Sequence, residues 1–263
     1  MTPALIDIGA NLGHESFDHD RDAVIAAARA AGVTTMIVTG TSVSASRKAA
    51  ELAASYPAEI YSTAGVHPHD ASEFSKAACS ELLELAQLPQ VVAIGETGLD
   101  FNRNFSPPLA QELAFAEQLN LAAQTRLPVF LHQRDAHERF LPILKEQRDL
   151  LVRAVVHCFT GTREEMYDYL DLDMYIGITG WVCDERRGLT IQPLLKDIPV
   201  DRLMLETDAP YLLPRTIRPR PKSRRNVPAY LPWVLQTVAL CTGREEKDVA
   251  IDTTRNARVF FAL

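Results

Sequence analysis

Eight short apolar runs, each typical of a β-strand, alternate along the whole chain with longer segments that are typical of helices. The strand-like runs cover residues 5–10, 34–40, 60–66, 91–95, 128–132, 154–159, 174–180 and 202–207. Because a helical segment separates each run from the next, the strands are expected to run parallel. A (β/α)₈ barrel needs eight such units and typically takes about 250 residues, close to the 263 residues of this chain. We therefore predict an α/β fold, a (β/α)₈ TIM barrel that forms a single domain over residues 1–263, with a doubly wound open sheet as the structural alternative.

The helical segments carry start and stop signals. Residues 20–32 form a helical segment that ends at Gly32, a residue suited to the left-handed position after a helix. In the next segment Ser44 or Ser46 is placed to cap the helix, and Pro57 follows its end. A further short helix is predicted near residues 190–197.

The chain shows no sign of membrane insertion or export. It has no run of eighteen apolar residues, and its N-terminal segment lacks the basic start and apolar stretch of a secretory signal. The four cysteines form no CxxC pair, which favours free thiols in a reducing compartment. These features predict a cytoplasmic protein without membrane contact.

The charge distribution is uneven. A net charge of −7 argues mildly against a general binder of polyanions, although a local cationic field suffices for a nuclease. One late segment contains six cations and no acid: Arg215, Arg218, Arg220, Lys222, Arg224 and Arg225. Because this segment follows the last predicted strand, we expect it to face phosphate rather than solvent alone.

Four of the strand-like runs end in, or are followed by, an acid or a histidine. These residues are Glu96, Asp100, His132, His157, Glu206 and Asp208. In a parallel barrel the carboxyl ends of all strands open into one mouth, so these side chains are expected to converge. Carboxylates together with imidazoles suit a hard-to-borderline divalent metal ion. The pattern therefore predicts a metal site and a hydrolase.

Other titratable residues are less constrained by the pattern. His67 and His69 flank Pro68 and point the same way if the segment is extended. We assign His67 to substrate or phosphate contact rather than to the metal, and for His69 a similar role and a solvated loop both remain open.

Of the two acids near the last strand, Asp208 is assigned the catalytic role and Glu206 a supporting or ion-pair role. Cys158 could be a soft metal ligand, but strand alternation is expected to turn its thiol into the core. Three histidines are expected to have no part in the chemistry: His14, His19 and His137. No serine nucleophile elbow, GxGxxG motif or P-loop occurs, which argues against acyl-enzyme chemistry and the common nucleotide-binding sheets.

Six sequence blocks, taken in order, resemble the signature blocks of the TatD family of metal-dependent nucleases. They are GVHPHD (65–70), GETGLDF (95–101), LHQRDA (131–136), HCFTG (157–161), GITGWV (177–182) and ETDAPYL (206–212). The likeness runs from about residue 5 to the end. It implies a (β/α)₈ barrel of the amidohydrolase type and a divalent-metal phosphodiesterase. By the same resemblance the activity would be a 3′→5′ exonuclease on single-stranded DNA and RNA, in a setting such as DNA repair or RNA turnover.

Carried over by motif, the resemblance implies that Glu96, His132 and His157 bind metal. It also implies that Asp208 handles the attacking water, so that Glu96 and Asp208 are catalytic and Asp208 is a further metal ligand. Mg²⁺ is the expected ion, and Mn²⁺ is expected to substitute for it.

One departure from the family pattern concerns the first strand. The family commonly has Asp-x-His-x-His there, whereas this chain has Asp7, Gly9 and Asn11 at the three positions. Both histidines are therefore missing. We expect one tightly held metal ion and a second that is weak or recruited by substrate.

Hydrolysis of a phosphodiester needs cations near the developing negative charge, and Arg134, Arg224 and Arg225 are assigned to this task. Phe101 is assigned to stacking on a terminal base; the other aromatic candidates are Phe105, Phe159 and Trp181. The protein is expected to act as a monomer without an obligatory protein partner. Two rival functions remain open: hydrolysis of a small cyclic amide or ester on the same barrel, and binding without catalysis at a decayed metal site.

Overall fold

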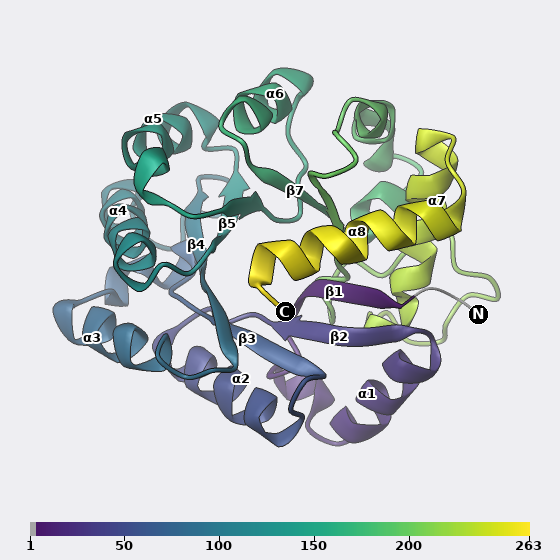
Figure 1. Ribbon diagram of the computed structural model, residues 1–263, viewed down its shortest axis with the longest axis horizontal. Coiled ribbons are helices and arrows are strands. Elements are labelled where there is room, and N and C mark those ends of the chain that lie inside the picture. Colours follow the sequence, from purple (N-terminus) through teal and green to yellow (C-terminus); the bar gives the residue numbers. More distant parts are fainter. Residues whose placement is uncertain (1–3) are drawn as a thin grey trace.

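The strands form one parallel barrel, seen from one end in Figure 1. The structure is a computed structural model and describes residues 4–263. Its strands are β1 (Leu5–Ala10), β2 (Val33–Val38), β3 (Ile60–Ala64), β4 (Val91–Asp100), β5 (Val129–Arg134), β6 (Ala154–Val156), β7 (Tyr175–Ile178) and β8 (Leu203–Leu205). Neighbours from β1 to β8 pair in sequence order and in parallel. A bridge between Ala10 and Ala209 joins the last strand to the first, so the predicted barrel is confirmed and the open-sheet alternative is wrong.

Helices surround the barrel (Figure 1). They are α1 (Arg21–Ala30), α2 (Val43–Ser55), α3 (Lys76–Leu85), α4 (Pro108–Thr125), α5 (His137–Gln147), α6 (Arg163–Asp171), α7 (Leu231–Thr242) and α8 (Glu246–Phe261). Gly32 follows α1 with a φ of 89°, as predicted. The cap of α2 is Ser42, whose Oγ accepts a hydrogen bond from the Ala45 N–H at 3.1 Å. The prediction of Ser44 or Ser46 was wrong because both already lie inside the helix.

The connection from β7 to β8 is built from 3₁₀ turns. They are η4 (Gly180–Cys183), η5 (Gly188–Thr190) and η6 (Gln192–Lys196). The short helix predicted near residues 190–197 is therefore a 3₁₀ segment, with Pro193 in its first turn. Within residues 4–263, no helix combines the length and the apolar character required to cross a bilayer.

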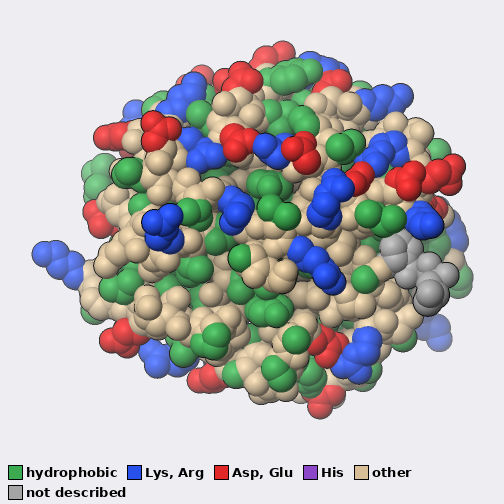
Figure 2. All heavy atoms as spheres, in the orientation of Figure 1, with side chains coloured by type: hydrophobic (Ala, Val, Ile, Leu, Met, Phe, Trp, Pro, Cys, Tyr) green, Lys and Arg blue, Asp and Glu red, His purple; other side chains and the backbone are tan. Residues whose placement is uncertain are grey.

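The barrel interior is apolar at one end, and α8 closes it there. Ile8, Phe130 and Met204 are fully buried inside the barrel, and Phe260 and Phe261 from the last turn of α8 join the same cluster. Figure 1 shows α8 crossing the end that faces the viewer. In Figure 2 the same face is a continuous surface on which acidic and basic side chains are mixed, with no central hollow. The polar strand-end residues must therefore meet at the opposite end.

Phe260 and Phe261 form an aromatic plug at the apolar end of the barrel. Truncation of one of these side chains is expected to destabilise the fold and to leave the polar residues at the opposite end unchanged. Phe260→Ala removes a fully buried ring, and such changes cost about 3–5 kcal/mol in the free energy of unfolding. Urea unfolding would measure the loss. Leu240→Ala on α7, where the residue is 81% exposed, is the matched control and should change stability by less than about 0.5 kcal/mol. Equal effects of the two variants would contradict a structural role for the plug.

Candidate active site

A cavity of about 660 Å³ opens at the end of the barrel opposite α8, a size typical of sites for small molecules. Its lining includes Glu96, His132, His157 and Asp208. These are the four residues predicted to bind metal, and they come from four different strand ends. The structure thus brings them together at the carboxyl ends of the strands.

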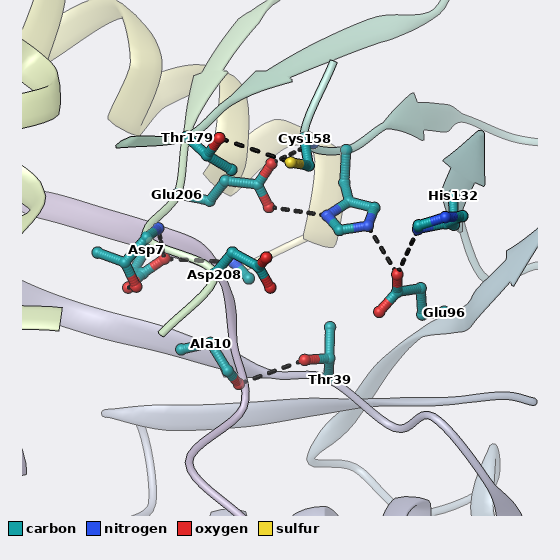
Figure 3. Close-up of polar contacts among 12 residues, drawn as sticks. Asp7, Ala10, Thr39, Glu96, His132, Cys158, Thr179, Glu206 and Asp208 are labelled. Atoms are coloured by element: carbon teal, nitrogen blue, oxygen red, sulfur yellow. Dashed lines mark hydrogen bonds and ion pairs between the residues drawn. The ribbon is translucent and has the colours of Figure 1, made fainter. Parts of the chain in front are cut away.

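Glu96 is buried at the cavity, and Figure 3 shows two histidine rings joined to one of its carboxylate oxygens. Three imidazole nitrogens approach its Oε1: Nε2 of His157 at 2.8 Å, Nδ1 of His132 at 2.9 Å and Nε2 of His67 at 3.3 Å. Burial would raise the pKa of Glu96, but the nearby charges of His157 and His67 and the hydrogen bonds from His132 and His157 hold it well below its usual range. The carboxyl group is therefore ionised.

An irregularity in β4 directs Glu96 into the cavity. Ile94 pairs with Val129 and Thr97 pairs with Leu131, so β4 contains one more residue than β5 between these two pairs. A bulge of this kind bends the strand and re-aims a side chain. The strand then continues to Asp100, beyond the predicted end at residue 95, and it is buried throughout.

Asp100 supports the imidazoles from another side. Its Oδ2 lies 2.9 Å from His69 Nε2 and 3.4 Å from His132 Nε2. Burial raises the pKa of Asp100, but hydrogen bonds from His132 and His69 outweigh burial and lower it. These contacts place His69 in the polar network of the site rather than in a solvated loop.

The donor set fits a divalent metal ion. His67, Glu96 and His132 each offer a ligand atom, and these atoms lie within 4.8 Å of one another. His132 Nε2 is buried and has no hydrogen-bond partner with good geometry among residues 4–263. The two nitrogens of this ring each lie beside a carboxylate, Nδ1 at 2.9 Å from Glu96 Oε1 and Nε2 at 3.4 Å from Asp100 Oδ2, and imidazole beside carboxylate is a natural ligand pair for such an ion. His67, which the sequence assigned to substrate contact, lies in this same cluster.

Glu206 is fully buried, and it contacts His157 on the side of the ring away from Glu96. Its Oε2 lies 3.3 Å from His157 Nδ1, and its Oε1 accepts a hydrogen bond from the Cys158 N–H. Two glycines leave room for it: a Cβ on Gly9 would overlap Oε2, and a Cβ on Gly177 would lie 2.8 Å from Oε1. Glu206 therefore fills the space into which a first-strand side chain at residue 9 would extend.

His157 is held between two carboxylates. Burial lowers its pKa, but the negative charges of Glu96 and Glu206 outweigh burial and raise the pKa well above its ordinary value. Glu206 occupies the Nδ1 side, which leaves Nε2 directed at the cavity and Glu96. A carboxylate in this position fixes the ring orientation and the tautomer of a ligating histidine.

Asp208 enters the cavity from the segment after β8. Its φ is 55°, and its N–H donates to the Gly9 carbonyl at 2.8 Å. Asn11 Nδ2 donates to Asp208 Oδ1 at 3.0 Å, so the amide that replaces a family histidine binds this carboxyl group. Burial and the charges of Glu96 and Glu206 raise the pKa of Asp208 to about 7 against the opposing effect of His157. With Oδ1 engaged, Oδ2 can exchange a proton near neutral pH.

Asp7 of β1 holds the segment that follows β8 through hydrogen bonds with Thr207. It is fully buried, and it accepts hydrogen bonds from the N–H of Thr207 at 2.8 Å and from the Thr207 hydroxyl. Burial dominates and raises the pKa of Asp7 to about 8. Asp7 does not line the cavity, so its role is to hold the backbone that presents Asp208.

The aromatic residue at the cavity differs from the prediction. Phe101 is absent from the lining and packs against the hydrophobic core. Because β4 runs on to Asp100, the loop begins later, and Phe105 reaches the cavity instead. Phe105 is 68% exposed, and its ring centroid lies 4.7 Å from that of His69. Trp181 also lines the cavity, and so does Tyr211, which sequence reasoning missed although it follows β8 closely.

Of the three arginines predicted to bind substrate, only one lies at the cavity. Arg134 lines the cavity, whereas Arg224 and Arg225 do not. Arg225 pairs with Asp20, with Nη2 at 2.5 Å from Oδ2, and Arg215 pairs with acids of the β7–β8 connection. The structure therefore gives no support to a phosphate-facing role for Arg225, because an acid distant in the sequence pairs with it.

Cys158 lies in the cavity lining, contrary to the prediction that its thiol is turned into the core. Strand β6 ends at Val156 and Cys158 has a φ of 46°, so strand alternation no longer applies. Burial, followed by the negative charge of Asp208, raises the pKa of the thiol well above its usual value. A neutral thiol is a poor metal ligand.

Of the three histidines expected to have no part, only His14 lines the cavity. Its ring centroid lies 5.9 Å from that of Tyr211, which forms part of the rim. His137 instead bonds to Tyr169 and Asp168, and His19 lies beside Asp20 with 75% of its side chain exposed.

Comparisons with known proteins agree with this geometry. The model of the family described as "TatD related DNase" matches residues 6–262. The chain is 55% identical to the "3'-5' ssDNA/RNA exonuclease TatD" of Klebsiella pneumoniae (strain 342) over 259 residues, which cover 98% of each chain. It is 56% identical to the protein of the same name from Cronobacter sakazakii over 257 residues, 98% of this chain and 97% of the relative. Among solved structures, a TatD family hydrolase from Entamoeba histolytica superimposes with a TM-score of 0.90 at 27% identity and 99% coverage of both chains.

Proposed function

Because the chain belongs to the TatD-related DNase family, we propose that it is a metal-dependent 3′→5′ exonuclease that hydrolyses phosphodiester bonds of single-stranded DNA and RNA. The observation that carries the proposal is the convergence of His67, His132 and His157 on Glu96 Oε1 at the floor of an open cavity. The intact cluster argues against a decayed site that only binds ligands.

We assign the metal to Glu96, His132 and His157, with Asp208 as a further ligand and His67 beside them. The proposed ion is Mg²⁺, as the family resemblance implies, and Mn²⁺ is the proposed substitute because it accepts imidazole as well as carboxylate ligands. When bound, such an ion supplies a Lewis acid that neutralises charge on the phosphodiester and lowers the pKa of water. The geometry of this chain favours one well-formed site, since Glu206 occupies the space beside Gly9.

The residues of the chain supply the proton transfer and the orientation. Asp208 Oδ2, left free while Oδ1 binds Asn11, is the proposed acceptor of the proton of the attacking water. Glu206 holds His157 by its Nδ1 side. Arg134, at the cavity wall, is proposed to bind a substrate phosphate.

Single strands fit this cavity better than duplexes because its exposed aromatic residues can stack on unpaired bases. Phe105 and Tyr211 are 68% and 51% exposed, and Trp181 also lines the cavity. We propose that these residues, rather than Phe101, contact the terminal nucleotides.

The test is degradation of a 5′-labelled single-stranded oligonucleotide by the purified protein with Mg²⁺, with Mn²⁺ and with EDTA. A metal-dependent ladder that shortens from the 3′ end is the expected result. An intact oligonucleotide under every metal, together with turnover of neutral cyclic amides or esters, would overturn the nuclease proposal in favour of acyl chemistry.

Metal binding is expected to release protons and to strengthen as pH rises from about 6 to 8. The raised pKa of His157 and the pKa of Asp208 near 7 mean that both groups hold protons in the metal-free protein at lower pH. Those protons must leave before the groups can ligate, so affinity is lost as pH falls. Calorimetry of Mn²⁺ binding in buffers of different ionisation enthalpy would measure the release. An affinity that stays constant over this range, with no proton release, would contradict the assignment of both ligands.

We further propose that the protein acts in the cytoplasm as a single-domain monomer without an obligatory protein partner. The four cysteines are all free, which fits a reducing compartment. Light scattering coupled to size-exclusion chromatography would measure the oligomeric state, and a dimer mass would overturn the monomer proposal.

A further inference from the structure

The cavity contains few cations for a site that receives a polyanion. Of the 27 lysines and arginines of the chain, only Lys48 and Arg134 line it. None of the six cations of the segment 215–225 does so. Arg134 was expected from the sequence, whereas Lys48 was not.

Lys48 lies on the second turn of α2 and is exposed at the cavity wall. Among residues 4–263 it takes part in no ion pair, so its ammonium group is available to a ligand. The neighbouring cation Arg47 behaves differently. Its Nη2 lies 2.6 Å from Glu81 Oε2, and it lines a separate groove between α2 and α3.

The surroundings of Lys48 favour an anion. Thr41, Ser44 and Ala45, from the N-terminal end of the same helix, line the cavity beside it. The positive end of the helix dipole adds to the charge of the lysine there. Asp70 lines both the cavity and the neighbouring groove that contains Arg47, but Glu73 and Glu81 line that groove alone, and these two further acids make it less favourable for a nucleic acid strand.

The position of Lys48 indicates which phosphate it meets. The scissile phosphate must reach Glu96 and Asp208, and Glu96 is buried on the floor. Lys48 is exposed at the wall, so it can only meet a phosphate that lies further out along the strand. In an enzyme that removes 3′-terminal nucleotides, that phosphate is on the 5′ side of the scissile one.

We propose that Lys48 is a substrate-binding residue that holds the phosphodiester on the 5′ side of the scissile bond, and so makes the protein favour strands of three or more nucleotides over dinucleotides. The proposal rests on the nuclease function proposed above. The chemistry recognised is an internal phosphodiester, which a dinucleotide without terminal phosphates lacks beyond its single scissile bond.

The experiment compares wild-type protein, Lys48→Ala, Lys48→Arg and the matched control Arg47→Ala. Binding of unlabelled di-, tri- and hexanucleotides without terminal phosphates is measured in EDTA by their competition with a fluorescein-labelled hexanucleotide in fluorescence anisotropy, and KM is measured with Mn²⁺. Lys48→Ala is expected to reduce the gain in affinity from dinucleotide to trinucleotide by about fivefold. It should also lower the slope of log affinity against log salt by about 0.7 for the hexanucleotide. Lys48→Arg should restore both, and Arg47→Ala should match the wild type.

The outcomes separate this proposal from the nuclease function. In one outcome the wild-type protein degrades oligonucleotides, and Lys48→Ala shows the same gain in affinity from dinucleotide to trinucleotide and the same salt slope as the wild type. That outcome overturns the assignment of Lys48 and leaves the nuclease function standing. Equal losses in Lys48→Ala and Arg47→Ala would also overturn it, because they would indicate a diffuse charge effect. A wild-type protein that neither binds nor degrades oligonucleotides would overturn both proposals.

Discussion

Glu96→Gln is expected to lower kcat by about three orders of magnitude or more, which corresponds to more than about 4 kcal/mol of transition-state stabilisation. The reason is that one oxygen of this carboxylate meets three imidazoles at 2.8, 2.9 and 3.3 Å. The substitution keeps the shape of the side chain but removes the negative charge that a metal ion and His157 both require. Steady-state hydrolysis of a labelled oligonucleotide would measure the loss, and calorimetry should show that Mn²⁺ binding is lost with it.

Glu112→Gln provides the matched control for this result. Glu112 forms an ion pair with Arg139 on the outside of the barrel, 2.7 Å between Oε2 and Nη2. The same chemical change there should leave activity and metal affinity intact. If Glu96→Gln retained wild-type activity with an unaltered melting temperature, the assignment of the catalytic site would be wrong.

Gly9→Ala is expected to impair both stability and catalysis although it adds only one methyl group. The new Cβ would overlap Glu206 Oε2 and would lie 3.1 Å from Phe130 Cζ, so the fully buried carboxylate must shift. Overpacking of this kind costs about 1–3 kcal/mol in the free energy of unfolding. Displacement of Glu206 from His157 should also weaken metal affinity by about 10- to 100-fold. Urea unfolding and calorimetry of Mn²⁺ binding would measure the two effects.

Gly13→Ala tests whether the effect is specific to this packing. Gly13 lies four residues further along the same segment and also lines the cavity, yet a Cβ there would meet nothing within 4 Å. That variant should resemble the wild type. Combining Gly9→Ala with Glu206→Asp should cost less than the sum of the two single changes, since a shorter acid relieves the overlap. Strict additivity would show that the two residues do not compete for the same space.

Much of this site could be predicted from the sequence because its residues follow the strand periodicity. Glu96, His132 and His157 end or follow apolar runs, and parallel strands place such residues at one mouth. Residues outside this periodicity were assigned other places: His67 was predicted to contact substrate rather than to join the metal cluster, and Cys158 was predicted to lie in the core. His67 reaches the cluster from the turn after β3, and Cys158 faces the cavity because its backbone is left-handed.

Other errors arose where contacts between distant segments decide the outcome. Arg225 is neutralised by Asp20, which lies 205 residues earlier in the chain, and no local count of charges reveals such a partner. The missing histidine at Gly9 is explained in the same way. A comparison of single sequence positions shows only that a histidine is missing at residue 9. The fold shows in addition that the Glu206 carboxylate occupies the space beside Gly9.

The plug formed by Phe260 and Phe261 comes from a helix that follows all eight strands in the chain, which affects folding during synthesis. All eight strands are synthesised before α8, so the apolar end of the barrel interior stays open to water until α8 has been made. A product truncated before α8 would therefore leave the apolar end of the barrel interior exposed to water.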